Sequence, residues 1–127
     1  MPSGREPFFA EVTQPITFEG LGSDNPLAFR WYDAERVVRG RPMAEHLRFA
    51  VAYWHSFATD GADMFGVGTW DRPWLTHDSG AGAGPSATLD AARSKMAVAF
   101  EFLEKLGAPF VCFHDRDIAP EGATFSE

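Results

Sequence analysis

Residues 88–114 read TLDAARSKMAVAFEFLEKLGAPFVCFH, and they carry the clearest structural pattern of the chain. Glu101 and Lys105 stand four residues apart in the order that favours a helix. Gly107 is typical of a helix end, and the apolar run 110–114 behind it is typical of a buried strand. One helical face collects the apolar side chains: Leu89, Ala92, Met96, Ala99, Phe100, Leu103 and Leu106. The stretch therefore predicts a long helix followed by a short strand.

Residues 47–57 lie upstream of that helix and have an ambiguous pattern. Aromatic, branched and other apolar side chains recur at alternate positions from Leu47 to Phe57, which favours a strand. The alanines would also allow a helix that continues from residue 43. With the strand, the order strand, long loop, helix, strand predicts one β–α–β unit, in which a right-handed crossover joins two parallel strands.

A single β–α–β unit is too small to stand alone. Parallel strands are normally covered on both faces, which two strands and one helix do not achieve. A closed β/α barrel needs about 250 residues, whereas this chain has 127. We therefore expect an α/β fold that is part of a larger barrel. The predicted organisation is an irregular N-terminal extension with short helices over residues 1–46, including Asp33–Val38 and Met43–His46, and an incomplete β-loop-α-β segment over residues 47–127.

The composition excludes several classes of partner. A net charge of −7 repels the phosphates of nucleic acids and of anionic membranes. The chain has no apolar run of about 18 residues, the length that spans a bilayer. Its single cysteine, Cys112, forms no internal disulfide and fits a reducing compartment. We therefore expect a cytoplasmic protein without a nucleic-acid or membrane partner.

The candidate chemistry lies where the second strand ends. His114 closes that strand, and its imidazole takes up and releases protons near neutral pH. Asp117, three residues on, is placed to accept the second ring N–H and so to fix the tautomer. The pair suits a reaction that moves a proton between oxygens, such as opening a cyclic sugar. Two alternatives stay open at this point: Asp115 and Asp117 satisfy backbone groups in a turn, or the three side chains hold a metal ion.

Aromatic residues supply further candidates. Trp54 would form a flat apolar wall against the C–H face of a sugar, or it would be an ordinary core residue. Phe65, Trp70 and Trp74 lie in the glycine-rich loop 58–87. Such loop aromatics contact another subunit or a ligand, or they fold back as a small satellite cluster.

Six stretches together resemble the class II bacterial xylose isomerases in their order and spacing: Asn25–Arg30, Glu45–Ala50, Tyr53–His55, Ala62–Gly66, Phe113–Asp117 and Pro120–Gly122. The resemblance implies the N-terminal part of a TIM (β/α)8 barrel that assembles as a homotetramer. It also implies two divalent metal ions, Mg²⁺, Mn²⁺ or Co²⁺. The implied reaction is the conversion of D-xylose to D-xylulose by ring opening and a hydride shift, with D-glucose as a further substrate of many members.

The resemblance also carries site residues onto this sequence. The family's ring-opening histidine falls on His114 and its partner aspartate on Asp117. The tryptophan that faces the substrate falls on Trp54, and the aromatic that reaches a neighbouring subunit's pocket falls on Phe65. The family's metal ligands and its catalytic lysine fall in later strands, beyond Glu127.

Two alternatives to a xylose isomerase segment stay open. The first is another barrel enzyme of similar architecture, such as a different sugar isomerase or an epimerase. The second is a non-catalytic fragment that only associates with other chains, because unpaired strand edges invite association. The residues that follow position 127 in the parent gene would discriminate between these readings.

The missing ligands generate the first testable prediction, because polarising the sugar oxygens needs the metal ions. The purified 127-residue chain, supplied with magnesium and D-xylose, is expected to form no D-xylulose. A ketose assay measures this directly. Robust magnesium-dependent xylulose formation would contradict the prediction.

Overall fold

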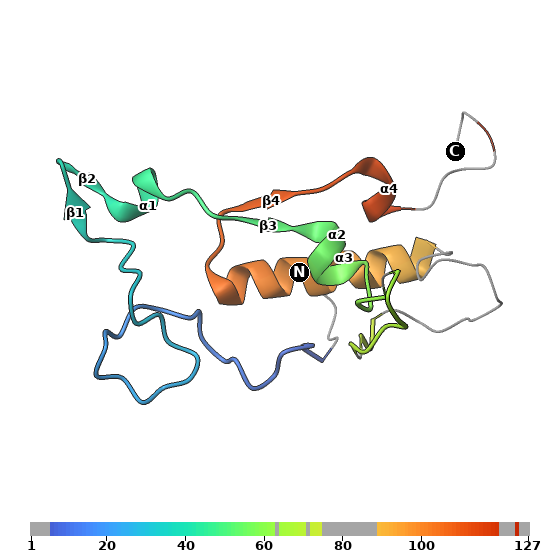
Figure 1. The fold of residues 1–127 in the computed structure, drawn as a ribbon, viewed down its shortest axis with the longest axis horizontal. Helices are drawn as coiled ribbons and strands as arrows, with labels where there is room; N and C mark the ends of the chain where they lie inside the picture. The colour runs from blue at the N-terminus through green and yellow to red at the C-terminus, as the bar shows by residue number, and fades with distance from the viewer. Residues whose placement is uncertain (1–5, 63, 71, 75–88, 120–123, 125–127) are drawn as a thin grey trace. The chain divides into compact units, whose positions relative to one another are not determined.

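The computed structural model describes residues 6–62, 64–70, 72–74, 89–119 and 124 (Figure 1). It divides into a first unit, residues 1–50 and 101–110, and a second unit, residues 51–100 and 111–127. Within the described ranges, no helix has the length and apolar character needed to cross a membrane. The elements in chain order are β1 (Val37–Val38), β2 (Arg41–Pro42), α1 (Met43–His46), β3 (Ala50–Ala52), α2 (Tyr53–Phe57), α3 (Leu89–Leu106), β4 (Phe110–Cys112) and α4 (Asp115–Ile118).

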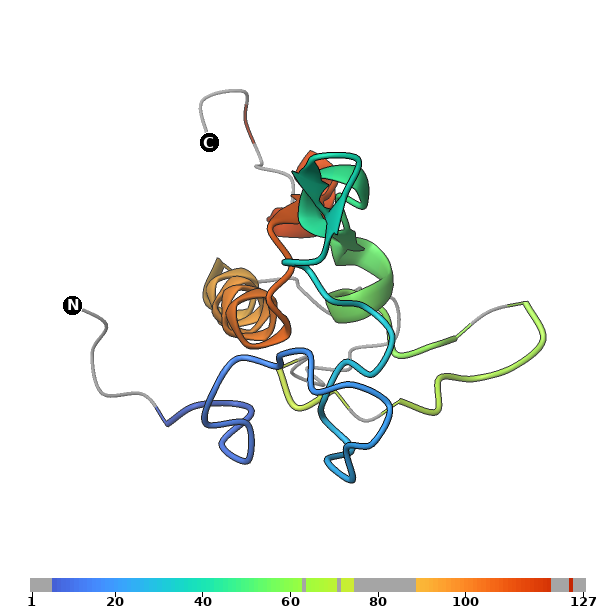
Figure 2. The same ribbon diagram turned by 90° about the vertical axis from the view of Figure 1, so that its left-hand side faces the viewer.

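The predicted β–α–β order is present. Strands β3 and β4 form a two-stranded sheet and run side by side in the same direction (Figure 1). The long helix α3 lies between them in the sequence, and Figure 2 views it almost end-on. The chain is therefore an α/β protein with a parallel strand pair, and no barrel closes within the part of the chain that the structure describes. The predicted boundary between the N-terminal extension, residues 1–46, and the β-loop-α-β segment, residues 47–127, remains a prediction.

The first predicted strand is much shorter than expected. Within residues 47–57 only Ala50–Ala52 forms a strand, and residues 53–57 form helix α2. A strand would place Tyr53, His55 and Phe57 on one face. Instead Tyr53 and Phe57 are each 2% exposed, their ring centroids are 5.5 Å apart, and His55 is exposed. Tyr53 and Phe57 are four residues apart, and residues at this spacing share a face in a helix and in a strand. Their positions therefore did not distinguish a helix from a strand.

The helix expected at Asp33–Val38 is also wrong. Val37 pairs with Pro42 and Val38 pairs with Arg41 in an antiparallel ladder. The connecting residues Arg39 and Gly40 have φ of 50° and 80°. Two successive positive φ angles are typical of a two-residue hairpin turn, so Gly40 turns a hairpin and does not end a helix. The helix expected at Met43–His46 is confirmed.

Helix α3, Leu89–Leu106, is the predicted long helix, but its buried face is rotated relative to the predicted apolar face. Leu89 and Phe100, expected on the apolar face, are 59% and 56% exposed. Gly107, with φ of 73°, ends the helix as predicted. The buried side chains of this helix recur at helical spacing and include one lysine: Ala91, Ala92, Lys95, Val98, Ala99 and Leu103.

The loop after α2 is described up to residue 74, and the remainder of the predicted loop lies outside the described residues. Trp74 is 7% exposed, and its indole N–H donates to the Phe57 carbonyl at 2.9 Å. The Arg72 guanidinium lies 5.0 and 5.3 Å from the ring centroids of Trp70 and Trp74. Trp74 therefore folds back as a satellite cluster, whereas Phe65 is 88% exposed.

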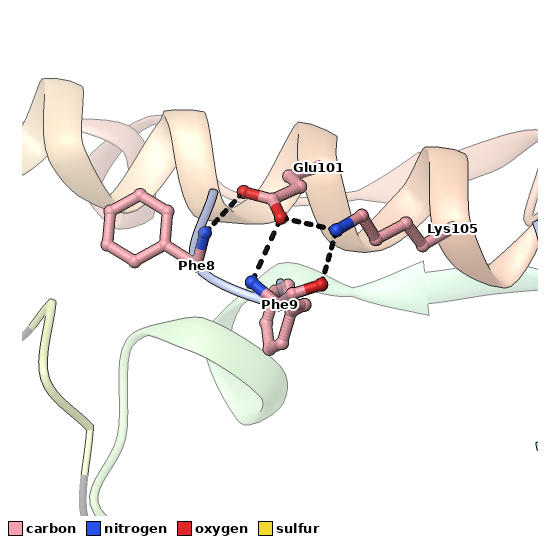
Figure 3. A network of polar contacts seen from close by, with 4 residues as sticks. All are labelled: Phe8, Phe9, Glu101 and Lys105. Carbon is pink, nitrogen blue, oxygen red and sulfur yellow. Dashed lines mark hydrogen bonds and ion pairs between the residues drawn. The ribbon is translucent and has the colours of Figure 1, made fainter. Parts of the chain in front are cut away.

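In the first unit, one carboxylate attaches the N-terminal segment to α3 (Figure 3). The backbone N–H groups of Phe8 and Phe9 each donate to the Glu101 carboxylate at 2.9 Å. The Lys105 ammonium lies 2.8 Å from the same carboxylate and also donates to the Phe9 carbonyl. Burial by itself would raise the pKa of Glu101, but the hydrogen bonds from Lys105 and the two amides outweigh it and lower that pKa.

This attachment is expected to depend on pH. A folded-state pKa below the unfolded value stabilises the attachment above the unfolded pKa, and that contribution is lost as the pH falls through the folded pKa. Protection of the Phe8 and Phe9 amides from hydrogen exchange should therefore hold at neutral pH and disappear below the usual glutamate range of about 4.3.

The variant Glu101→Gln should lower that protection about fivefold at neutral pH, because a charge-assisted hydrogen bond becomes a neutral one. Glu104→Gln, at an exposed position of the same helix, is the matched control. Equal exchange of the two amides in both variants would contradict the role of Glu101.

Candidate active site

The candidate site lies in the second unit, directly after strand β4. The chain leaves the strand at Cys112, and His114 then precedes the single-turn helix α4, where the sequence predicts a polar turn. His114 is extended, with φ of −102° and ψ of 156°, and its carbonyl accepts a hydrogen bond from the Asp117 N–H at 3.0 Å. This short turn brings residue 117 back over residue 114.

Asp117 makes two contacts to His114 through one oxygen. Its Oδ2 atom accepts from the His114 backbone N–H at 2.7 Å and lies 2.9 Å from the Nδ1 atom of the imidazole. The side chain of Asp117 is 17% exposed, whereas that of His114 is 68% exposed. A carboxylate accepts only, so the neutral imidazole carries its proton on Nδ1.

Trp54 joins this pair from a different element. It lies in helix α2, which follows strand β3, and its ring centroid is 4.7 Å from that of His114 at an interplanar angle of 43°. The structure therefore brings three of the four sequence-predicted residues together after the ends of two neighbouring parallel strands. Phe65, the fourth, lies in the loop after α2 with its side chain facing solvent.

Two further polar residues, Tyr53 and Lys95, lie buried in the second unit, and the sequence analysis singled out neither as a site residue. Tyr53 is 2% exposed, and its hydroxyl has no hydrogen-bond partner within the described residues. Burial, together with the negative charge of Asp117, raises the pKa of Tyr53 to about 12. The ammonium of Lys95, itself 2% exposed, lies 5.6 Å from the Tyr53 ring centroid.

Lys95 is the buried cation of helix α3. Burial lowers the pKa of its ammonium, and the negative charge of Asp117 opposes that shift. Lysine is usually exposed, so its residue type gave no sign of this burial. The available signal was its position four residues after Ala91 and three before Val98, which puts it on the face that these small residues form.

The described residues were compared with the donor set that a divalent ion needs. They contain no group of three or more His, Cys, Asp and Glu side chains that could hold a metal. The alternative that His114, Asp115 and Asp117 form a metal site is therefore not supported.

These features are those of the β/α class of proteins. The chain has a parallel β–α–β core, and a histidine–carboxylate pair and an indole meet after its strand ends. In β/α enzymes, catalytic groups project from that edge of the sheet.

Comparison with known proteins identifies the particular relatives. Over 120 residues, 94% of its length, the chain is 52% identical to the xylose isomerases of Brucella ovis, Brucella abortus and Brucella melitensis. The matched segment is 25% of each relative, so the chain spans about a quarter of their length. No family model matches the chain. The chain is thus homologous to xylose isomerases over nearly all of its length, which confirms the resemblance that its motifs indicate.

The contact between Asp117 and His114 generates a prediction about the imidazole. In the neutral side chain the proton should lie on Nδ1, and Asp117→Ala should move it to Nε2, because the acceptor at Nδ1 is lost. The ¹⁵N shifts of the ring distinguish the two tautomers. Asp115→Asn is the matched control, since among the described residues Asp115 Oδ1 accepts a hydrogen bond from the neighbouring Arg116 N–H, at 2.8 Å. An unchanged tautomer in Asp117→Ala would contradict the role of the carboxylate.

Proposed function

We propose that this chain provides the ring-opening part of a xylose isomerase, an enzyme that converts D-xylose to D-xylulose. The observation that carries the proposal is the Asp117–His114–Trp54 arrangement, in which the imidazole lies 2.9 Å from a carboxylate oxygen and beside an indole. The homology to proteins named xylose isomerase supports the same reaction. In this proposal the chain contributes two strands of a TIM barrel.

Opening a pyranose moves one proton between two oxygens. With Nδ1–H held by Asp117, the Nε2 atom of His114 is the basic atom of the ring. It takes the proton of the anomeric hydroxyl, the anomeric carbon forms a carbonyl, and the bond from that carbon to the ring oxygen breaks. The imidazolium then gives the proton to the ring oxygen. The products are the open-chain aldose and the original imidazole, so no proton is gained or lost.

In this step Asp117 stabilises the charged form of His114. While the imidazole holds the sugar's proton it is positively charged, and the adjacent carboxylate stabilises that charge. Trp54 provides the apolar wall against which the C–H face of the sugar packs, and it excludes water from the pair. Phe65, exposed on its loop, is the proposed contact to a neighbouring subunit of a homotetramer.

The hydride shift that completes isomerisation belongs to the proposed whole protein, together with the divalent ions that polarise the sugar oxygens. D-xylose is the proposed substrate, and D-glucose a second one. No nucleic acid or membrane is part of the proposal.

The ring-opening role is tested in a chimera. This chain replaces the matching 120 residues of the Brucella melitensis xylose isomerase, and activity on D-xylose is compared with activity on D-glyceraldehyde. The three-carbon sugar is too short to close a pyranose, so it needs the hydride shift but not ring opening. His114→Asn should lower kcat/KM for xylose about 100-fold or more and change that for glyceraldehyde less than about threefold, because general acid–base catalysis is lost only where a ring must open.

His46→Asn is the matched control, because this exposed histidine contacts the Val38 carbonyl at 2.9 Å in the first unit. It should leave both activities close to those of the parent chimera. An equal loss on both sugars in His114→Asn, or no loss on xylose, would refute the assignment of His114 to ring opening.

A further inference from the structure

The loop after helix α2 carries an apolar tip, residues 64–67. Met64, Phe65 and Val67 are 88%, 88% and 86% exposed. None of the residues 64–67 has a charged side chain. A single exposed apolar residue is ordinary on a protein surface, but a group of them marks a contact site for another molecule.

Asp60 closes the base of this loop. Its carbonyl accepts hydrogen bonds from the N–H groups of Thr69 and Trp70, at 3.1 and 2.9 Å. Its side-chain Oδ1 atom accepts from the Ala62 N–H at 3.0 Å. One residue therefore holds the chain on both sides of the apolar tip, and the tip lies on a loop whose two ends are joined.

Gly68 lies directly against the Asp60 side chain. A Cβ atom at Gly68 would overlap the Asp60 carboxylate, so a larger residue there would push the carboxylate off the Ala62 amide. Gly61 makes a second close approach, because the nearest atom of the Trp70 ring lies 3.1 Å from the position that a Cβ would occupy. The two sides of the base are thus closer than side chains at these glycines would permit.

The closed base is attached to the core of its own unit. The loop begins after Phe57, which is 2% exposed, and returns to Trp74, whose indole N–H donates to the Phe57 carbonyl at 2.9 Å. Between these two residues, the Arg72 Nε atom donates to the Thr59 carbonyl at 3.5 Å. The base therefore has a buried support on both sides.

We propose that Asp60 is a positioning residue that acts through Phe65: with Gly68 it forms a clamp that holds the apolar tip in a preformed shape for contact with a second copy of this chain. The inference rests on the proposed contact of Phe65 with a neighbouring subunit and extends it to the residues that hold the tip. Association costs free energy when loops and side chains become ordered at an interface, and a loop whose base is already closed avoids part of that cost.

The absence of charge on the apolar tip favours a second copy as its partner. Each copy carries a net charge of −7, so two copies repel one another over most of their surfaces. An uncharged contact lets them meet without like charges facing each other. The surface that receives the tip is accordingly apolar, as the centres of subunit interfaces are.

The first test measures the assembly of the chimera. Asp60→Ala removes the acceptor of the Ala62 amide, and it should raise the dissociation constant between subunits about five- to tenfold, because the tip must then become ordered on binding. Asp60→Asn keeps an oxygen acceptor at the same position, so it is the matched control and should stay within about twofold of the parent. Sedimentation velocity over a dilution series measures both constants. A parent-like constant in Asp60→Ala, or an equal loss in Asp60→Asn, would overturn the proposal.

A double-mutant cycle separates positioning from a general structural role. If Asp60 acts through Phe65, Asp60→Ala has no further effect on assembly in a Phe65→Ala background. A structural role would weaken assembly to the same extent in both backgrounds, and that result would overturn the proposal. A parent-like dissociation constant in Phe65→Ala would refute the subunit contact and the clamp together, whereas the ring-opening role of His114 is decided separately by the two sugars.

A further measurement does not depend on assembly. In the 127-residue chain, the amides of Ala62, Thr69 and Trp70 should be protected from hydrogen exchange. Gly68→Ala should lower the protection of Ala62 about fivefold, because the added methyl group displaces the carboxylate that accepts from this amide. Gly66→Ala is the matched control, because a Cβ there meets no atom of the described residues within 4 Å. Exchange of all three amides in the parent at the rate of an unfolded chain, or equal effects of the two alanine variants, would overturn the proposal.

Discussion

A single carboxylate oxygen organises the region after strand β4. Asp117 Oδ2 accepts from the backbone N–H of His114 and contacts the Nδ1 atom of the same residue. The first contact fixes how the chain leaves the strand, and the second fixes how the imidazole is turned. Because both pass through one atom, the backbone geometry and the chemistry of the site cannot change independently. The tilted ring contact between Trp54 and His114, and the electrostatic effect of Asp117 on Lys95 and Tyr53, both go with this placement.

Buried charge and exposed chemistry are separated in this arrangement. His114 is largely accessible to solvent, as a group that exchanges protons with a substrate must be. The Asp117 carboxylate beside it is more buried, and water screens its charge less there. In the first unit, the half-buried Glu101 carboxylate likewise accepts hydrogen bonds from two backbone amides and pairs with the Lys105 ammonium. In both places one carboxylate satisfies several donors and thereby orders a segment without regular secondary structure.

The sequence predicted the long elements well and the short ones poorly. Helix α3 spans five turns, so periodicity, the Glu101–Lys105 pair and Gly107 all agree over its length. Tyr53 and Phe57 belong to a five-residue helix, which is too short for periodicity to distinguish from a strand. The hairpin at Arg39 and Gly40 was missed because a glycine after a charged stretch is equally typical of a helix end.

From the sequence alone came the strand–helix–strand order, the homology to xylose isomerases and the pairing of His114 with Asp117, because three-residue spacing across a turn is a local property. Only the tertiary structure decided that Trp54 lies against His114, since they are 60 positions apart and the parallel strands bring them together. It also decided that Lys95 is buried, because the side of a helix that faces inward depends on what packs against it. Local spacing fixes which neighbours can meet, whereas burial is a property of the whole chain.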